Sequence, residues 1–218
     1  MIDWGFVLEI LPILAKAAIV SVEATLLGFA LALVLGLLLA LARLARSAWM
    51  STPATLVVEF IRSTPLLIQI YFLFFVLPEF GITLSAFTAG VLALGLHYGS
   101  YCAEVYRAGL ENVPRGQWEA SVALNFSTAH TYRAIVLPQA IPPIVPVLGN
   151  YFIALFKETP LLSAIAVLEL MQTAKILGSD NFRYFEPITL VGLFFLGMSL
   201  VASALNQAVE RRLKASRR

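Results

Sequence analysis

Five stretches of the chain are apolar over enough residues to cross a membrane as helices. A helix needs about 20 mostly apolar residues to cross the hydrocarbon core of a bilayer. The pattern therefore predicts spans at about residues 13–41, 56–77, 82–103, 134–156 and 188–209. A further apolar stretch, residues 159–168, is too short to span and suits a re-entrant or boundary helix. We expect an all-helical integral membrane protein with one transmembrane domain over residues 1–218.

Composition supports this class. Hydrophobic residues make up 60% of the chain and charged residues only 13%, which is about half the charged share of soluble domains. The net charge of +2 is too small to indicate a nucleic-acid partner. The single cysteine, Cys102, excludes an internal disulfide and a cysteine-rich metal site. We expect neither a metal nor a cofactor on this chain.

Lysine and arginine are distributed unevenly between the loops. The first twelve residues contain neither, whereas the connections after the first and third expected spans and the C-terminal segment are rich in arginine. Because positive charge gathers in cytoplasmic loops, we expect the N-terminus outside and the C-terminus in the cytoplasm. The loop at about residues 107–133 then lies in the cytoplasm.

This loop has the pattern of two short helices around a tight turn. The first is expected at residues 117–124, and Asn125 follows it at a position where a positive φ ends the helix. Ser127 can cap the second helix. From physical chemistry alone two interpretations stay open: an amphipathic segment lying on lipid, or a docking element for a soluble partner.

Several motifs in a fixed order resemble those of a known family. Three of them are Gly-Gln-Trp-Glu-Ala-Ser at residues 116–121, Leu124-Asn125, and Ile-Val-Leu-Pro-Gln-Ala at residues 135–140. Together they resemble the EAA loop of ABC-importer permeases of the polar amino-acid uptake family. The same family is matched by Arg-Ser-Thr-Pro-Leu-Leu (62–67), Tyr-Cys-Ala-Glu-Val-Tyr-Arg-Ala-Gly (101–109), Gly149-Asn150 and Lys-Glu-Thr-Pro-Leu (157–161). The last motif, with Phe-Arg-Tyr-Phe-Glu-Pro at residues 182–187, is closest to the ectoine/hydroxyectoine branch.

Two positions of the loop depart from the family pattern. Asn125 stands where the family has glycine, and Ser121 where it has alanine. Asparagine tolerates the left-handed conformation, and serine is nearly the size of alanine. Both residues are therefore compatible with the expected conformation of the loop.

The resemblance implies the type I ABC importer permease fold and a multi-pass subunit of an ATP-driven importer in a bacterial plasma (inner) membrane. It implies a polar amino acid or amino-acid-like compatible solute as cargo, with ectoine or hydroxyectoine favoured and a general amino acid such as glutamine, arginine or histidine as the alternative. The implied partners are an ABC ATPase dimer, a second permease subunit (identical or a sister chain) and an extracytoplasmic substrate-binding protein. The implied ATPase-coupling residues are Arg115, Gly116, Gln117, Trp118, Glu119, Ala120, Ser121, Leu124 and Asn125.

Trp118 is expected to anchor the docked ATPase, because large aromatic residues carry much interface energy. The alternative is a residue of the membrane-interface belt. The chain lacks the Gly-x-x-x-x-Gly-Lys-Ser/Thr phosphate cradle. We therefore expect ATP hydrolysis on a separate chain and no enzymatic activity here.

The end of the fourth expected span carries the strongest candidates for the substrate pathway: Lys157, Glu158, Thr159 and Pro160. Thr-Pro is typical of an N-cap and first helical residue. The positive end of a short helix would then receive a substrate carboxylate and Glu158 the cationic part. The alternative is a structural corner with solvated charges. Glu23 is a further pathway candidate, unless it pairs within the complex.

Other polar groups in the spans are expected to be structural. Glu104 with Arg107, and Glu59 with Arg62, have the spacing of ion pairs on one helix face. His97 is expected to be a hydrogen-bonded packing residue. The prolines of the fourth expected span should bend or interrupt it.

Two other function classes fit the pattern less well. A membrane enzyme would need a nucleophile with its base or a set of metal ligands, and the sequence has neither Gly-x-Ser-x-Gly nor His-Glu-x-x-His. An ATP-independent channel or secondary transporter would have no ATPase for the EAA-like loop to bind. Five spans are also few for a transporter built of repeats.

Overall fold

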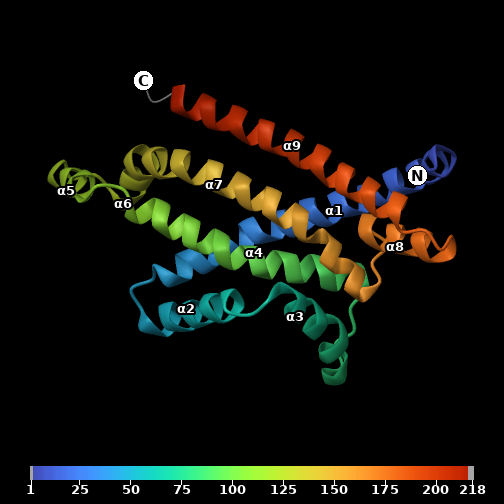
Figure 1. Ribbon diagram of the computed structural model, residues 1–218. Coiled ribbons are helices and arrows are strands. Elements are labelled where there is room, and N and C mark those ends of the chain that lie inside the picture. Colours follow the sequence, from blue (N-terminus) through green and yellow to red (C-terminus); the bar gives the residue numbers. More distant parts are fainter. Residues whose placement is uncertain (1, 216–218) are drawn as a thin grey trace.

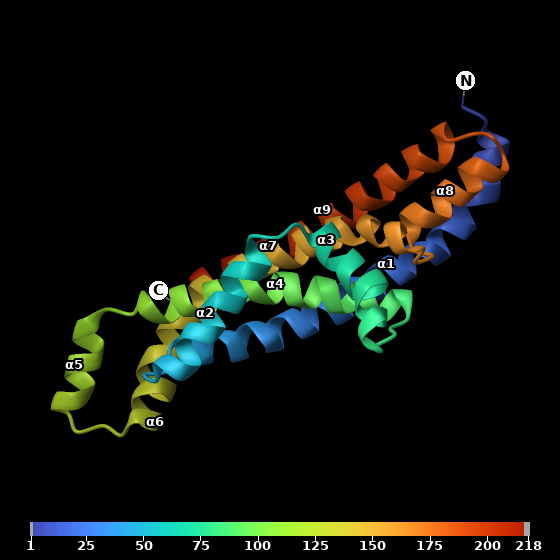
Figure 2. The same ribbon diagram turned by 90° about the horizontal axis from the view of Figure 1, so that it is seen from below.

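The computed structural model describes residues 2–215, and this part of the chain contains helices and no strands. Four long helices run side by side along the molecule, namely α1 (Trp4–Arg43), α4 (Ala86–Glu111), α7 (Leu137–Glu158) and α9 (Phe185–Ala215) (Figures 1 and 2). The shorter helices are α2 (Ala48–Arg62), α3 (Leu66–Tyr71), α5 (Arg115–Ala123), α6 (Thr128–Thr131) and α8 (Leu170–Asp180). Short stretches of other helical types are η1 (Phe72–Val76), η2 (Leu77–Phe80), η3 (Tyr132–Val136) and η4 (Thr159–Ile165).

The centre of the bundle is the close packing of α1 against α4. Small residues of α1, including Ala24, Ala32 and Ala40, are buried there. The backbones approach so closely that a Cβ on Gly36 would lie 2.5 Å from Cβ of Cys102. Small residues at a membrane helix interface permit this approach, so α1 and α4 form a tight central pair.

The expected number of five spans is not confirmed by helix length and hydropathy. Within the described residues, three helices are long and apolar enough, at Trp4–Arg43, Thr128–Ile165 and Phe185–Leu213, and the bent pair α2 and α3–η2 makes up to four. The helix of the third expected span, α4, is not among them. It lies inside the bundle and carries small and polar residues on its buried face, so composition alone does not mark it as a lipid-facing helix.

The second expected span is broken rather than straight. The segments Ala48–Arg62 and Leu66–Phe80 are bent by 105° at the Ser63–Thr64–Pro65 connection. Proline biases the residue before it away from the helical region. The side chain of Gln69 holds the break, because its Nε2 donates hydrogen bonds to the backbone oxygens of Ile61 (2.7 Å) and Thr64 (3.1 Å).

The prolines of α7 do not interrupt it. α7 is continuous over Leu137–Glu158, and the irregularity lies before it, in the π-helical turn η3. Pro138 removes one backbone donor at this junction. Gln139 Nε2 donates to the oxygen of Ile135 at 2.8 Å and so satisfies one carbonyl there.

A short helix follows α7 at nearly the place expected for it, residues 159–168. The 3₁₀ helix η4 covers Thr159–Ile165 and continues directly from α7, and a separate helix, α8, follows at Leu170–Asp180. The chain turns between them at Ala166, whose φ is 59°. Whether these elements lie in or on the membrane stays a prediction.

The two ends of the bundle differ. The start of α1 lies beside α8 at one end, whereas α5, α6 and the end of α9 lie at the other (Figures 1 and 2). At the first end, Arg183 bridges Asp3 (2.9 Å) and Glu186 (2.5 Å). Arg217 and Arg218, which contribute to the expected cytoplasmic charge, lie outside the described residues. The sides of the membrane that the two ends face remain a prediction.

Candidate functional site

The loop between α4 and α7 forms a projection beyond one end of the bundle (Figure 2). α5 occupies Arg115–Ala123, close to the expected first helix. Asn125 has a φ of 54°, as expected, and the amide of the next residue, Phe126, donates to the oxygen of Ser121 at 3.0 Å. Ser127 caps the second helix as expected, by accepting from the amide of His130. The loop is therefore an ordered two-helix unit, which we call the coupling loop.

One side of α5 faces the rest of the chain. Trp118 is half-buried, and its ring lies 5.3 Å from that of Tyr132 in an edge-on contact. It packs beside the buried residues Val113 and Val136. Ser121 is buried and its hydroxyl donates to the oxygen of Gln117 at 2.7 Å. Trp118 thus packs α5 against its own chain through one part of its ring. Its expected role as an anchor for the ATPase stays a prediction.

The opposite side of α5 is free of intramolecular cover. The exposed coupling residues are Arg115, Gly116, Gln117, Glu119, Ala120, Leu124 and Asn125. Val122 is 79% exposed and Leu124 is 64% exposed. An exposed apolar pair on a short polar loop is typical of a contact surface. Sequence reasoning did not single out Val122 as a site residue, although an apolar side chain in this polar segment is a usable signal.

A cluster of polar and aromatic side chains lies between α2–α3, α4 and α7. We call it the aromatic–polar cluster, and its members are Arg62, Gln69, His97, Tyr98, Tyr101, Tyr151 and Glu158. His97 Nδ1 lies 3.2 Å from Oε1 of Gln69, which fits its expected role as a hydrogen-bonded packing residue. The ring centroids of Tyr101 and Tyr151 are 5.6 Å apart. The cluster therefore connects the broken segment after α2 to α4 and α7.

Glu158 is the predicted pathway residue that belongs to this cluster. Tyr98 lies beside its carboxylate. Within the described part of the chain, Oε2 of Glu158 is buried without a hydrogen-bond partner. A buried acceptor without a partner is costly, so this oxygen is available to a donor from outside the chain. Tyrosines inside an otherwise apolar helix were the signal that sequence reasoning did not use for this cluster.

The other predicted pathway residues are not gathered with Glu158. Lys157 is exposed and Thr159 is buried. The Thr159 hydroxyl donates back to the oxygen of Phe156 at 2.9 Å, so it does not cap a following helix. A short 3₁₀ helix, η4, does begin at Thr159 with Pro160 in its first turn, directly after α7. That the start of this helix receives a substrate carboxylate stays a prediction.

Glu23 lies on an exposed face of α1. Among the hydrogen bonds and ion pairs of the described residues, none joins it to Lys16 or to residues 157–160. Its assignment to the pathway stays a prediction. By contrast, both expected helix-face ion pairs are present: Arg107 to Glu104 at 2.8 Å and Arg62 to Glu59 at 3.8 Å.

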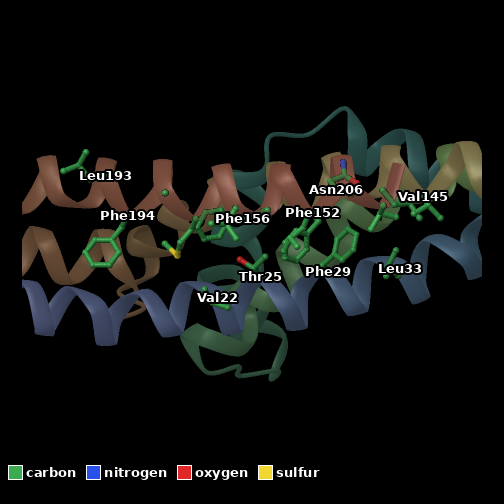
Figure 3. Close-up of a pocket in the computed structure, with 18 of the residues that line it drawn as sticks. Val22, Thr25, Phe29, Leu33, Val145, Phe152, Phe156, Leu193, Phe194 and Asn206 are labelled. Carbon is green, nitrogen blue, oxygen red and sulfur yellow. The ribbon is translucent and has the colours of Figure 1, made fainter. Parts of the chain in front are cut away.

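A large apolar groove lies between α1, α7 and α9 (Figure 3). Its volume is about 1000 Å³, and aromatic side chains such as Phe29, Phe152 and Phe156 line it. Its polar members are already engaged, because Thr25 donates to the oxygen of Ser21 and Asn206 to the oxygen of Pro146. A polar solute would lose its hydration here without compensation. The groove suits acyl chains or an apolar helix better than a zwitterion.

Two comparisons of sequence agree on the family. The model for the family described as "Binding-protein-dependent transport system inner membrane component" matches residues 32–215. The probable amino-acid ABC transporter permease protein y4tG of Sinorhizobium fredii is 44% identical over 211 residues, which cover 97% of this chain and 91% of the relative. The glutamine transport system permease protein GlnP of Escherichia coli is 34% identical over 215 residues, covering 97% and 98%.

The fold agrees with this result. A chain from the crystal structure of an amino acid ABC transporter with histidines matches with a TM-score of 0.92 and 35% identity, over 97% of this chain and 99% of that one. The relatives are translocation subunits of membrane transporters rather than enzymes. The chain belongs to the family of binding-protein-dependent transport system inner membrane components.

Proposed function

We propose that this chain is the translocation subunit of an ATP-driven importer for a polar amino acid. The observation that carries the proposal is the coupling loop, which projects from one end of the bundle with an exposed face on α5. The chain has no phosphate cradle of its own, so a separate ABC ATPase dimer supplies the energy. A second permease subunit and an extracytoplasmic binding protein complete the complex.

Replacement of Glu119 by lysine tests the role of the loop. Glu119 is exposed on α5, so its charge can be reversed without loss of an internal contact. We expect uptake to fall to background, because a reversed charge at a protein interface opposes docking. The measurement is radiolabelled amino-acid uptake by cells, together with the amount of ATPase that co-purifies with the permease.

Asp180→Lys is the matched control. Asp180 is also exposed, and it ends α8 at the opposite end of the bundle, so the same charge reversal there should leave uptake unchanged. Normal uptake by Glu119→Lys, with a normal amount of assembled ATPase, would remove the coupling loop from the mechanism.

Amino acids are favoured as the cargo over ectoine. The relatives that support the family are described as amino-acid and glutamine permeases, whereas the ectoine assignment rests on two short motifs. Titration of the purified complex and its binding protein with glutamine, arginine, histidine and ectoine distinguishes the two. We expect an amino acid to stimulate ATP hydrolysis at a lower concentration than ectoine, and the reverse order would restore the ectoine assignment.

Glu158 is the residue of this chain best suited to face the cationic part of the cargo. Its side chain is half-buried, its Oε2 is buried without a partner in the described structure, and Tyr98 lies beside it. Glu158→Gln keeps the shape and removes the charge. We expect the concentration of cargo for half-maximal uptake to rise at least about tenfold, which is the order of one charged hydrogen bond. An unchanged value would exclude direct contact with the cargo.

A further inference from the structure

The carboxylate of Glu104 joins three helices at the end of the bundle that carries the coupling loop. Its Oε1 accepts from Nη1 of Arg43 at 2.7 Å and from Nη1 of Arg62 at 3.1 Å, and its Oε2 accepts from Nη2 of Arg107 at 2.8 Å. Arg43 ends α1 and Arg62 ends α2. Glu104 and Arg107 belong to α4. One carboxylate therefore fixes the ends of two helices against a third.

The charges at this point are sheltered from water. The side chain of Arg43 is only 10% exposed and that of Glu104 is 20% exposed. A sheltered cation is destabilising unless it is paired. The neighbouring carboxylates are more peripheral, because Glu59 lies 3.8 Å from Arg62 and is 56% exposed, and Glu111 is 52% exposed. Neither of these two carboxylates contacts Arg43 in the described structure, so neither can take over the ion pair that Glu104 makes with Arg43.

This cluster lies between the coupling loop and the aromatic–polar cluster. In one direction, Arg62 stacks over Tyr101 at 5.3 Å, Tyr101 contacts Tyr98, and Tyr98 lies beside Glu158. In the other direction, α4 continues to Glu111, and three residues lead from there to the start of α5 at Arg115. A displacement of α5 therefore acts on the same helix that presents Glu104.

We propose that Glu104 is a positioning residue that transmits movement of α5 to the ends of α1 and α2, and from Arg62 to the aromatic–polar cluster. Movement of α4 against α1 or α2 must stretch or exchange an ion pair at Glu104, so the three helix ends move together. Glu104 contacts neither cargo nor nucleotide in this role. The inference rests on the proposed function, because it concerns how work from an ATPase reaches the pathway.

The test uses the complete complex of permease, ATPase and binding protein in lipid nanodiscs. The quantity measured is the ratio of ATP hydrolysis with cargo-loaded binding protein to hydrolysis without it. Glu104→Gln keeps the shape of the side chain and removes its charge. We expect this ratio to fall at least about fivefold, the lower end of the coupling measured between linked sites. Glu104→Asp, which keeps the charge, should retain most of the ratio, and Glu59→Gln should match the unmodified complex.

A second variant separates coupling from folding. Glu104→Gln leaves the sheltered Arg43 unpaired, which can lower stability. The double variant Glu104→Gln with Arg43→Gln removes that cation as well, and its thermal melting should return toward that of the unmodified complex. We expect the ratio to stay low in the double variant, because the ion pair between Arg62 and position 104 of α4 is still absent.

Two results would overturn the inference. One is an unchanged ratio in Glu104→Gln; the other is a ratio in the double variant that recovers together with its melting temperature, which would mean a purely structural role. An unmodified complex without any cargo-dependent ATP hydrolysis would instead contradict the proposed function. The two failures are therefore distinguishable.

Discussion

At the scale of the residue, Asp3 stabilises the start of α1 in two ways. Its Oδ1 caps the helix by accepting from the amides of Gly5 (3.0 Å) and Phe6 (3.2 Å). Its Oδ2 accepts from Arg183, which belongs to the turn before α9. The Arg183 guanidinium, together with the amides at the helix start, holds the pKa of Asp3 below its ordinary value of 3.8. The ionised carboxylate therefore joins the start of α1 to the turn before α9.

We expect Asp3→Asn to lower thermal stability at neutral pH while keeping the cap, because asparagine caps helices as well as aspartate. A lowered pKa means that Asp3 contributes its stability above the ordinary value and loses it as the pH falls through the folded value. The difference in melting temperature between the two proteins should therefore be constant above about pH 5 and shrink below it. A difference that grows on acidification would contradict this role of Asp3.

At the scale of the element, the packing of α1 on α4 depends on the absence of side chains. A Cβ on Gly36 would meet Cβ of Cys102 at 2.5 Å and the backbone oxygen of Gly99 at 2.9 Å. Backbone cannot move aside without separating the two helices. By contrast, a Cβ on Gly192 of α9 would have open space around it.

We expect Gly36→Ala to destabilise the purified chain by about 1–3 kcal/mol, the usual cost of overpacking. Gly192→Ala should be neutral or stabilising, since alanine favours a helix over glycine by about 0.5–1 kcal/mol. Thermal melting of the two variants in the same detergent compares them directly. Equal stability of both would show that α1 and α4 separate easily.

The pattern of apolar residues predicts the long helices well, because each needs a continuous apolar stretch. It does not predict where they break. At the bend after Arg62, Gln69 hydrogen-bonds back to the oxygen of Ile61, and α7 stays a single helix through its prolines. Neither result follows from the order of apolar and polar residues within the segment itself.

For the candidate site, the two-helix shape of the coupling loop can be predicted from the sequence, because its turn and cap depend on Asn125 and Ser127 alone. The ATPase-coupling role of its residues stays a prediction. The aromatic–polar cluster was not predicted as a unit, because it combines residues of α2, α3, α4 and α7 that are far apart in sequence. The pair of Glu104 with Arg107 was foreseen from helix spacing. Its bonds to Arg43 and Arg62 required the fold.

At the scale of the whole molecule, the start of α1 and the coupling loop lie at opposite ends of the bundle (Figure 1). If the excess of arginine marks the cytoplasmic side, the α8 end faces outward. The natural Cys102 is fully buried, so it contributes little background to labelling of introduced cysteines.

We expect Asp180→Cys, at the end of α8, to react with a membrane-impermeant maleimide in intact cells. Val122→Cys, on the exposed face of α5, should react only after the cells are permeabilised, in a strain without the ATPase. Quantitative mass shift of the labelled chain is the measurement. The opposite pattern would invert the topology and place the coupling loop outside.

The apolar groove between α1, α7 and α9 has a practical consequence for anyone who isolates the protein. The groove has a volume of about 1000 Å³ and is lined mainly by aromatic and aliphatic side chains. Contact of such a surface with water is unfavourable. We therefore expect surfactant tails or retained phospholipid to occupy this space after extraction from the bilayer. Harsh delipidation would then expose the groove to water and favour precipitation.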